Sequence, residues 1–339
     1  MKLVRFLLFP IALLYGLVMS IRNLLFHCRI WTPRRFQTPL IGVGNLATGG
    51  TGKSVVIDYL LTAFKKKFRL AVLSRGYGRS SKGFVLGKAD STASALGDEP
   101  FQFSRKHPEV TVAVAEKRVE GVEHLLNQFS KTEAILLDDV MQHRWIQPHL
   151  LVLTTTFNQP YSQDFVLPMG NLREWRKGAR RADIILITKT PPKATPADRD
   201  RIKQSLKLAS NQSVYFCATA YAKFIDGAAH KPLVDIAIKK FILVTGIADA
   251  APLVSYLKGL NFDFEHLEYP DHYAFSKATV GRIEHKAQNT FILTTEKDFG
   301  RLQPLISKKV LLYYLPIQLK FLNAQEEQAF LLQIEDLLQ

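Results

Sequence analysis

The chain has 339 residues and 47% of them are apolar, which excludes gross disorder and is long enough for two ordinary domains. Its formal net charge of +15 favours an anionic partner, such as nucleic acid, an anionic membrane face or a phosphorylated substrate. Cys28 and Cys217 are the only cysteines, which excludes a disulfide framework or a zinc site and fits a reducing compartment.

The N-terminal segment combines positive charge with an apolar run. No Asp or Glu precedes Asp58, whereas seven Lys and Arg residues do. Residues 6–21 are uncharged and almost wholly apolar, but they are fewer than the roughly 20 residues of a membrane span and include Pro10 and Gly16. The run predicts a helix that lies in a membrane surface or inserts shallowly, with its basic flanks on anionic lipid.

Two alternatives stay open for this run. A basic start followed by an apolar segment is also typical of a signal peptide, although no small-x-small cleavage site follows it here. The run could equally form a helix that is buried against the rest of the protein.

Short apolar segments then alternate with helical stretches. The predicted strands are residues 39–45, 70–74, 110–114, 134–137, 150–154 and 184–188, and residues 55–64 have the periodicity of a helix. A second series begins near Phe241 and continues through 291–295 and 310–314. This alternation predicts an α/β fold with a parallel sheet and helices on both faces.

The apolar N-terminal run and the second series of strands and helices suggest three parts. We expect an N-terminal membrane-anchoring helix in residues 1–35, a larger nucleotide-binding domain in 36–220 and a smaller α/β domain in 221–339. The join falls between Tyr215 and Lys240.

A glycine-rich turn connects the first predicted strand to the first predicted helix. It contains Gly49, Gly50, Thr51, Gly52, Lys53 and Ser54. In such a loop backbone N–H groups cradle phosphates, the lysine reaches the β and γ oxygens, and the serine hydroxyl can bind magnesium. The strict pattern G-x-x-x-x-G-K-[ST] requires glycine where this chain has Ala47, so a chance match is the alternative.

The strand at 134–137 runs directly into Asp138 and Asp139. Carboxylates at the end of a buried strand hold the metal ion in P-loop enzymes, whereas a solvated Asp-Asp turn is the alternative. After the strand at 184–188 the chain has Pro191 where a GTPase would carry the Asp of its Asn-Lys-x-Asp motif. The expected cofactors are therefore ATP and Mg²⁺.

Residues 171–183 are strongly basic. Asn171 and Glu174 resemble a variant capping box, which predicts a helix. Such a helix would carry one basic stripe formed by Arg173, Arg176, Lys177, Arg180 and Arg181. The stripe is either a solvated face or a surface for anionic lipid or a substrate phosphate.

Further short motifs follow in a characteristic order. They are Ser74-Arg75-Gly76-Tyr77-Gly78-Arg79, Gly97-Asp98-Glu99-Pro100, Asp138-Asp139-Val140-Met141-Gln142-His143, Leu172-Arg173-Glu174, Asp271-His272 and Thr295-Glu296-Lys297-Asp298. With the glycine-rich loop, they resemble the tetraacyldisaccharide 4′-kinase family over nearly the whole chain. The departures are Val140-Met141, where the family usually has Gly-Phe, and Ser54, where threonine is common.

The resemblance implies a P-loop NTPase-like α/β/α sandwich, a second, smaller α/β/α domain, and an active site between them. It implies an ATP-dependent lipid kinase that phosphorylates the 4′-hydroxyl of tetraacyldisaccharide 1-phosphate in lipid A biosynthesis. The protein would work at the cytoplasmic face of the bacterial inner membrane, held peripherally or monotopically through its N-terminal helix. No nucleic acid and no obligate protein partner is expected.

The resemblance also implies roles for individual residues. The expected catalytic residues are Lys53, Asp98, Asp139 and His272, with Asp98 taking the proton of the acceptor hydroxyl and His272 orienting it. The expected metal site is Ser54, Asp138 and Glu99, and the expected substrate contacts are Arg75, Tyr77, Arg79, Asn171 and Arg173. From the residues alone, Asp98 could instead cap a helix and His272 could be structural.

Two other functions compete with this one. A P-loop kinase of a soluble small molecule would use the N-terminal apolar run as core. A nucleotide-dependent switch or nucleic-acid binder would explain the positive charge, but the basic residues lack interleaved stacking aromatics.

Overall fold

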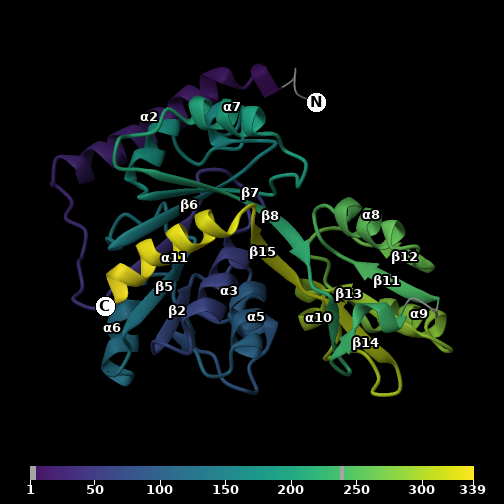
Figure 1. Ribbon diagram of the computed structural model, residues 1–339. Helices are drawn as coiled ribbons and strands as arrows, with labels where there is room; N and C mark the ends of the chain where they lie inside the picture. Colours follow the sequence, from purple (N-terminus) through teal and green to yellow (C-terminus); the bar gives the residue numbers. More distant parts are fainter. Residues whose placement is uncertain (1–4, 237–239) are drawn as a thin grey trace.

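The computed structural model describes residues 5–236 and 240–339. These residues form two sheets with helices on both sides of each, one sheet in the larger and one in the smaller lobe (Figure 1).

The larger sheet has nine strands in the order β15-β8-β7-β6-β1-β5-β2-β4-β3, with β3 and β15 antiparallel at the edges. The strands are β1 (Leu40–Gly44), β2 (Leu70–Ser74), β3 (Val85–Leu86), β4 (Thr111–Val114), β5 (Ala134–Asp138), β6 (Leu150–Thr156), β7 (Ile184–Thr188), β8 (Ser213–Tyr221) and β15 (Ile317–Phe321). Every residue of β1, β2, β5 and β7 is buried, as expected for parallel strands covered on both faces.

Helices cover both faces of this sheet. One face packs against α3 (Lys53–Phe64), α5 (Asp98–Lys106) and α11 (Ala324–Leu338), and the other against α6 (Arg118–Gln128) and α7 (Pro196–Leu206). The remaining short elements are α4 (Ala93–Leu96) and the 3₁₀ helices η1 (Tyr161–Gln163) and η2 (Arg176–Arg181). The predicted α/β/α sandwich is therefore confirmed.

The smaller sheet has six strands in the order β10-β9-β14-β13-β11-β12. They are β9 (Phe224–Gly227), β10 (Lys231–Pro232), β11 (Phe241–Thr245), β12 (Phe264–Glu268), β13 (Phe291–Thr295) and β14 (Leu311–Leu315). The helices are α8 (Ala251–Gly259) on one face, α9 (Lys277–Lys286) and α10 (Glu296–Leu302) on the other, and η3 (Leu233–Ile236). All nine predicted strands are present; the strand expected near Phe241 begins there, and the other eight lie within two residues of their expected ends.

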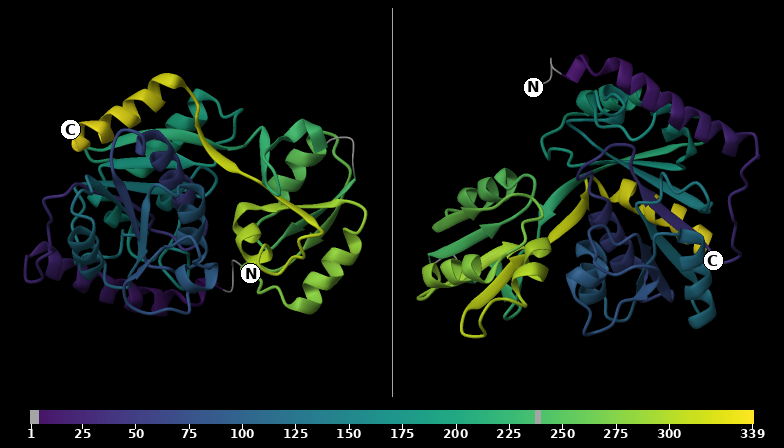
Figure 2. Two further views of the ribbon diagram at one scale, coloured as in Figure 1. Left: turned by 90° about the horizontal axis from the view of Figure 1, so that it is seen from below. Right: turned by 180° about the vertical axis from the view of Figure 1, so that it is seen from behind.

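The C-terminal segment corrects the expected division. After β14 the chain returns to the larger sheet, where β15 pairs antiparallel with β8 and α11 packs beside α3, so residues 317–339 do not belong to the smaller lobe (Figure 2). Leu319, Phe321, Phe330 and Ile334 are buried against the core of the larger lobe, and this apolar burial holds the segment there. Two chain crossings, β8 to β9 and β14 to β15, therefore join the lobes.

The helix predicted for residues 171–183 is wrong. Only Arg176–Arg181 is helical, as the 3₁₀ helix η2. No capping box forms, because the Asn171 side chain donates to Asp164 and the buried Glu174 carboxylate accepts two bonds from Arg181. Tertiary partners thus outweigh the local helical pattern.

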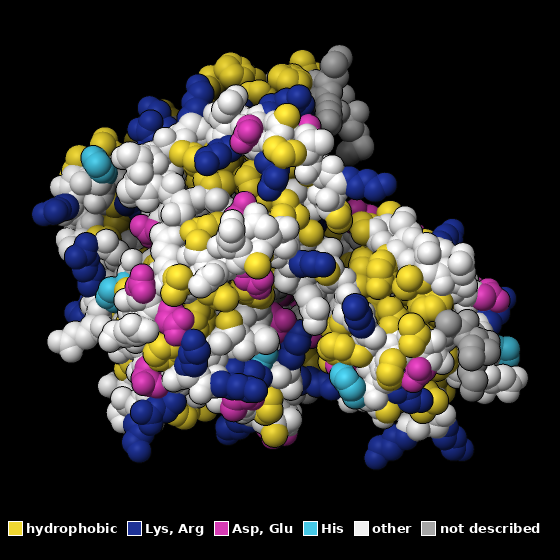
Figure 3. Space-filling model, in the orientation of Figure 1, with side chains coloured by type: hydrophobic (Ala, Val, Ile, Leu, Met, Phe, Trp, Pro, Cys, Tyr) yellow, Lys and Arg dark blue, Asp and Glu magenta, His cyan; other side chains and the backbone are white. Residues whose placement is uncertain are grey.

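The N-terminal apolar run forms the 19-residue helix α2 (Phe9–His27). It is long and apolar enough to cross a membrane by length and composition, with a mean hydropathy of 1.6 and only 17% of the window buried. Ala12, Gly16 and Phe26 face the larger lobe, and most apolar side chains of the helix face outward. A buried core helix is therefore excluded, and Figure 3 shows the exposed apolar band along this edge of the molecule.

Candidate active site

The glycine-rich loop lies between β1 and α3, at the carboxyl edge of the larger sheet. Gly49 and Gly52 have φ of +102° and +86°, which only glycine adopts without strain, and Gly52 immediately precedes the helix that Lys53 begins. A side chain at Gly49 or Gly50 would meet no atom within 4 Å, so this face of the loop is open. The N-terminus of α3 therefore faces open space that suits a phosphate group.

Buried polar contacts hold the loop from below. The Asn45 amide donates to the Thr51 hydroxyl over 2.9 Å, and that hydroxyl lies 2.8 Å from the Thr154 hydroxyl of β6. Thr188, the last residue of β7, donates to the Thr51 carbonyl over 2.8 Å. Three neighbouring strands thus fix the loop before any ligand binds.

Ala47 does not disturb this loop. Its φ is not in the left-handed region, so glycine is not required there, and it forms an antiparallel bridge with Leu172. The departure from the strict pattern therefore leaves the loop geometry intact.

The paired aspartates lie beside the loop at the end of β5. Asp138 is buried and accepts a hydrogen bond from the Ser74 hydroxyl over 2.8 Å. Asp139 lies 3.5 Å from the Lys53 ammonium and accepts two bonds from Arg173 at 2.8 and 3.0 Å. The structure therefore brings Lys53, Asp139 and Arg173 together.

The two carboxylates differ in their electrostatic surroundings. Burial and the adjacent Asp139 charge raise the pKa of Asp138 to about 6. Burial also opposes ionisation of Asp139, but Lys53 and Arg173 outweigh it and hold the pKa of Asp139 below its usual range. A cation bound beside Asp138 would relieve the cost of its buried charge.

These side chains fit magnesium better than a metal with many protein ligands. The Ser54 hydroxyl makes no hydrogen bond to another described residue. Within residues 5–236 and 240–339, no three His, Cys, Asp or Glu side chains gather closely enough to hold a metal, so Glu99 does not complete a three-carboxylate site with the aspartates. Mg²⁺ typically takes one or two carboxylates and fills its other positions with water and phosphate oxygens.

The turn after the aspartates explains the Val140-Met141 departure. Both side chains are buried, and they lie directly over two glycines of β1. A Cβ at Gly42 would lie 2.7 Å from Val140, and one at Gly44 would lie 2.7 Å from Met141. Val140, which is larger than the glycine usual in the family, therefore fits because β1 has no side chain at Gly42, and Met141 lies close to β1 because Gly44 has none either.

Asp98 and His272 come from different lobes and meet. Asp98 is the first residue of α5, and His272 has a φ of +58° in the loop after β12. The His272 Nδ1 lies 3.2 Å from the Asp98 Oδ2, so the expected pairing is present. Burial opposes ionisation of Asp98, but Arg301 binds both carboxylate oxygens and, with Lys297 and His272, lowers the pKa of Asp98.

The residues expected to contact substrate fall into two groups. Arg75 and Tyr77 are exposed on the loop after β2, and the Tyr77 ring lies 6.4 Å from the His272 ring. Arg79, in contrast, is bound to Glu116 and to the Gly83 carbonyl, so it holds its own loop together.

Asn171 and Arg173 lie between the phosphate loop and α2. The Asn171 carbonyl accepts from the Thr48 N–H over 2.7 Å, and the Tyr15 hydroxyl of α2 donates to the Arg173 carbonyl over 2.7 Å. This segment therefore links the N-terminal helix to the loop.

Arg301 and Tyr15 were not predicted from the sequence as parts of the site. Arg301 follows the Thr295-Glu296-Lys297-Asp298 motif by three positions, and this spacing on a helix was the available signal. Tyr15 gave no local signal, because it is one more ring in an apolar run.

Comparison with known proteins gives a consistent result. The family model described as Tetraacyldisaccharide-1-P 4'-kinase matches residues 4–336. The chain is 45% identical to a Tetraacyldisaccharide 4'-kinase of Flavobacterium johnsoniae, over 96% of this chain and 95% of that protein. It is 37% identical to the corresponding kinase of Bacteroides thetaiotaomicron, over 95% and 90% of the two chains.

A solved structure agrees over the whole chain. The crystal structure of LpxK from Aquifex aeolicus in complex with ATP matches with a TM-score of 0.81 and 26% identity, covering 99% of this chain and all of that one. The match includes both lobes and the N-terminal helix. By sequence, fold and the geometry of its site, the chain belongs to the tetraacyldisaccharide-1-P 4'-kinase family.

Proposed function

We propose that the protein is an ATP-dependent lipid kinase that transfers the γ-phosphate to the 4′-hydroxyl of tetraacyldisaccharide 1-phosphate in lipid A biosynthesis. The observation that carries this function is the whole-chain family match, joined to a phosphate loop whose Lys53 lies against Asp139. Phosphoryl transfer asks a protein mainly for positioning and charge neutralisation, which this site can supply.

ATP would bind with its phosphates on residues 49–54. Lys53 would neutralise charge on the transferring phosphate and Asp139 would hold the lysine in place. Ser54 and Asp138 would hold Mg²⁺, with Glu99 acting through water, and the metal would neutralise charge between the β and γ phosphates.

The acceptor hydroxyl would approach from the side of Asp98. Asp98 would accept its proton, and His272 would keep the carboxylate oriented. The exposed Arg75 and Tyr77 lie on the loop beside this pair and would contact the sugar or its 1-phosphate. Arg173, which binds Asp139, would contact the substrate from the side opposite Arg75 and Tyr77.

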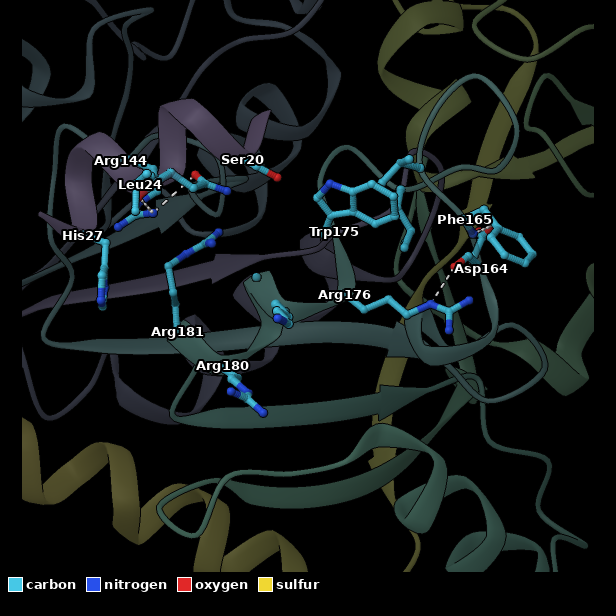
Figure 4. A pocket seen from close by; sticks show the side chains of 15 residues that line it. Ser20, Leu24, His27, Arg144, Asp164, Phe165, Trp175, Arg176, Arg180 and Arg181 are labelled. Carbon is cyan, nitrogen blue, oxygen red and sulfur yellow. Dashed lines mark hydrogen bonds between the residues drawn. The ribbon is translucent and has the colours of Figure 1, made fainter. Parts of the chain in front are cut away.

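The membrane surface is the proposed location of the enzyme, at the cytoplasmic face of the inner membrane. The outward apolar side chains of α2 would enter the acyl boundary. Beside α2 lies a cavity of about 970 Å³, lined by Leu24, Phe165 and Trp175 and by basic residues of η2 (Figure 4). Lys177 and Arg180 are exposed there, without a hydrogen bond or ion pair to the described residues, and would attract anionic headgroups.

A transfer assay tests the activity. Radiolabelled ATP and tetraacyldisaccharide 1-phosphate in detergent should give a labelled lipid, and ³¹P NMR should place the new phosphate at the 4′ position. Absence of transfer to the lipid by intact protein would contradict the proposal.

A vesicle-binding assay tests the membrane location separately. Reversing the charges of Arg176, Lys177 and Arg180 should weaken binding to vesicles that contain phosphatidylglycerol. The matched control reverses three exposed lysines of the smaller lobe, Lys258, Lys308 and Lys309. If both triple variants bind these vesicles equally well, Arg176, Lys177 and Arg180 do not contribute to membrane binding.

A further inference from the structure

The two lobes meet where α10 packs on α5. A Cβ at Gly300 would lie only 2.9 Å from the Phe101 ring, and the Arg105 guanidinium lies 4.9 Å from the Phe299 ring centroid. Arg105 also donates to Gln303 over 2.7 Å. The contact between these helices is close and specific, and the pair Asp98–His272 lies at one end of it.

Arg301 of α10 holds Asp98 directly. Its Nε donates to Oδ1 over 3.0 Å and its Nη2 donates to Oδ2. The guanidinium is itself fixed, because Nη1 lies 3.3 Å from the fully buried Asp298 on the same helix. A carboxylate has roughly four acceptor sites, so Arg301 and His272 together leave about one for an acceptor hydroxyl.

Lys297, one helical turn before Arg301, contacts the other side of His272. Its ammonium lies 2.9 Å from Nε2. An ammonium and a guanidinium can only donate, and the Arg301 Nη2 lies 2.9 Å from Nδ1, so the ring proton is placed by the acceptors around His272. The Asp98 Oδ2 lies 3.2 Å from Nδ1, whereas the Asp271 Oδ2 lies 3.8 Å from Nε2, beyond hydrogen-bond distance. The geometry therefore favours the proton on Nδ1, with Lys297 donating to Nε2. With the proton on Nδ1, the Arg301 Nη2 donates to the Asp98 Oδ2 and not to the ring. Asp271 lies 3.6 Å from Lys297 and supports its charge.

The same motif anchors the backbone of the histidine loop. Thr295 and Asp298 bond each other at the start of α10, and Asp298 accepts from the Gly246 N–H over 2.8 Å. The Gly246 carbonyl in turn accepts from the His272 N–H over 3.1 Å. This bond helps to hold His272 in a left-handed conformation that a non-glycine residue rarely adopts.

We infer that Lys297 and Arg301 are the positioning residues of the proposed base. Lys297 selects the Nδ1–H tautomer of His272, and Arg301 fixes the Asp98 carboxylate so that one acceptor site faces the hydroxyl. The α5–α10 contact assembles this arrangement before substrate binds. The inference rests on the proposed role of Asp98 and His272.

The tautomer is directly measurable. In protein labelled with ¹⁵N-histidine, long-range ¹H–¹⁵N spectra distinguish the two neutral tautomers. The His272 signals are assigned without a Lys297 variant, as those that disappear in His272→Gln. The wild type should show the Nδ1–H pattern. An Nε2–H pattern in the wild type overturns the inference, whatever the variants do.

Kinetics of paired variants test the consequence. Lys297→Met should lose the Nδ1–H pattern and reduce kcat about tenfold to a hundredfold, with the KM for ATP unchanged. Lys297→Arg keeps a donor and should retain most of the rate. Arg301→Met should reduce kcat similarly and Arg301→Lys should recover part of it, whereas Lys308→Met, on an exposed lysine, should have no effect.

Two outcomes separate this inference from the proposed function. If Asp98→Asn is inactive while Lys297→Met and Arg301→Met keep wild-type kcat, the positioning roles are wrong, but Asp98 remains the proposed base. If Asp98→Asn keeps full activity, the proposed base is wrong. Equal losses in Lys297→Met and Lys297→Arg would also overturn the tautomer role.

Discussion

The two halves of the site are built differently. The phosphate-loop half comes from adjacent parallel strands of one sheet, because β1 carries the loop, β5 carries Asp138, and Thr154 and Thr188 lie on β6 and β7. The Asp98–His272 half joins residues 174 positions apart, and Arg301 is 203 positions from Asp98. The first half depends on strand order within one lobe, whereas the second depends on the contact between lobes.

Because the two halves are built differently, substitutions in each half should impair different functions. Changes in the loop half should impair ATP binding and transfer together. Changes in the interlobe half should impair transfer and leave ATP binding intact, because no side chain of that half supports the loop. The following variants test this separation, from the largest expected effect to the smallest.

Replacing Lys53 should have the largest effect. Lys53→Met removes the ammonium that lies 3.5 Å from Asp139 and would neutralise the transferring phosphate, so we expect kcat/KM to fall about a thousandfold or more. Lys66→Met, on an exposed lysine just past the end of the same helix, is the control. A loss of less than tenfold in the transfer assay would contradict the role of Lys53.

Replacing Asp98 should come next. Asp98→Asn should reduce kcat about a hundredfold to ten-thousandfold, since general-base catalysis contributes by that order. Calorimetric ATP affinity should stay within about twofold of wild type, because Asp98 makes no bond to the loop. Asp90→Asn, on an exposed carboxylate, is the control. Weakened ATP binding in Asp98→Asn would contradict the expectation that the Asp98–His272 half of the site does not contribute to ATP binding.

A methyl group at the interlobe contact should have a smaller effect. Gly300→Ala would place Cβ 2.9 Å from the Phe101 ring, so α10 must shift or the ring must move. We expect kcat to fall a few-fold, on the order of 1 kcal/mol of lost positioning, with unchanged ATP affinity. Gly281→Ala on α9, where a Cβ meets nothing within 4 Å, is the matched control. Identical kinetics for both variants would show that the contact tolerates movement.

The hydrogen bonds beneath the loop should have the smallest effect. Thr188→Val removes the donor to the Thr51 carbonyl, which should cost about 1 kcal/mol of unfolding free energy and weaken ATP binding a few-fold. Thr190→Val also loses a buried bond, to the Ile187 carbonyl, but none to the loop. Its ATP affinity should therefore stay at the wild-type value, and denaturant unfolding with calorimetry checks both quantities.

Features that depend on chain neighbours could be predicted from the sequence, whereas features that depend on distant contacts could not. The strands, the loop and the aspartates at the end of β5 were predicted because each depends on residues that are neighbours in the chain. The helix expected at 171–183 failed because Glu174 and Asn171 bind Arg181 and Asp164 instead of the local backbone. Residues 317–339 were assigned to the wrong lobe because nothing local indicates that β15 pairs with β8.

The sequence by itself determined the two series of strands, the phosphate loop, an apolar segment at the N-terminus and the family. Each of these depends on periodicity or on a short motif, which chain neighbours specify. Only the tertiary structure decided that the C-terminus returns to the larger lobe, that Arg79 holds its own loop, and that Arg301 and Lys297 converge on Asp98 and His272. These contacts join residues far apart in the chain, and packing between the lobes, rather than local preference, brings them together.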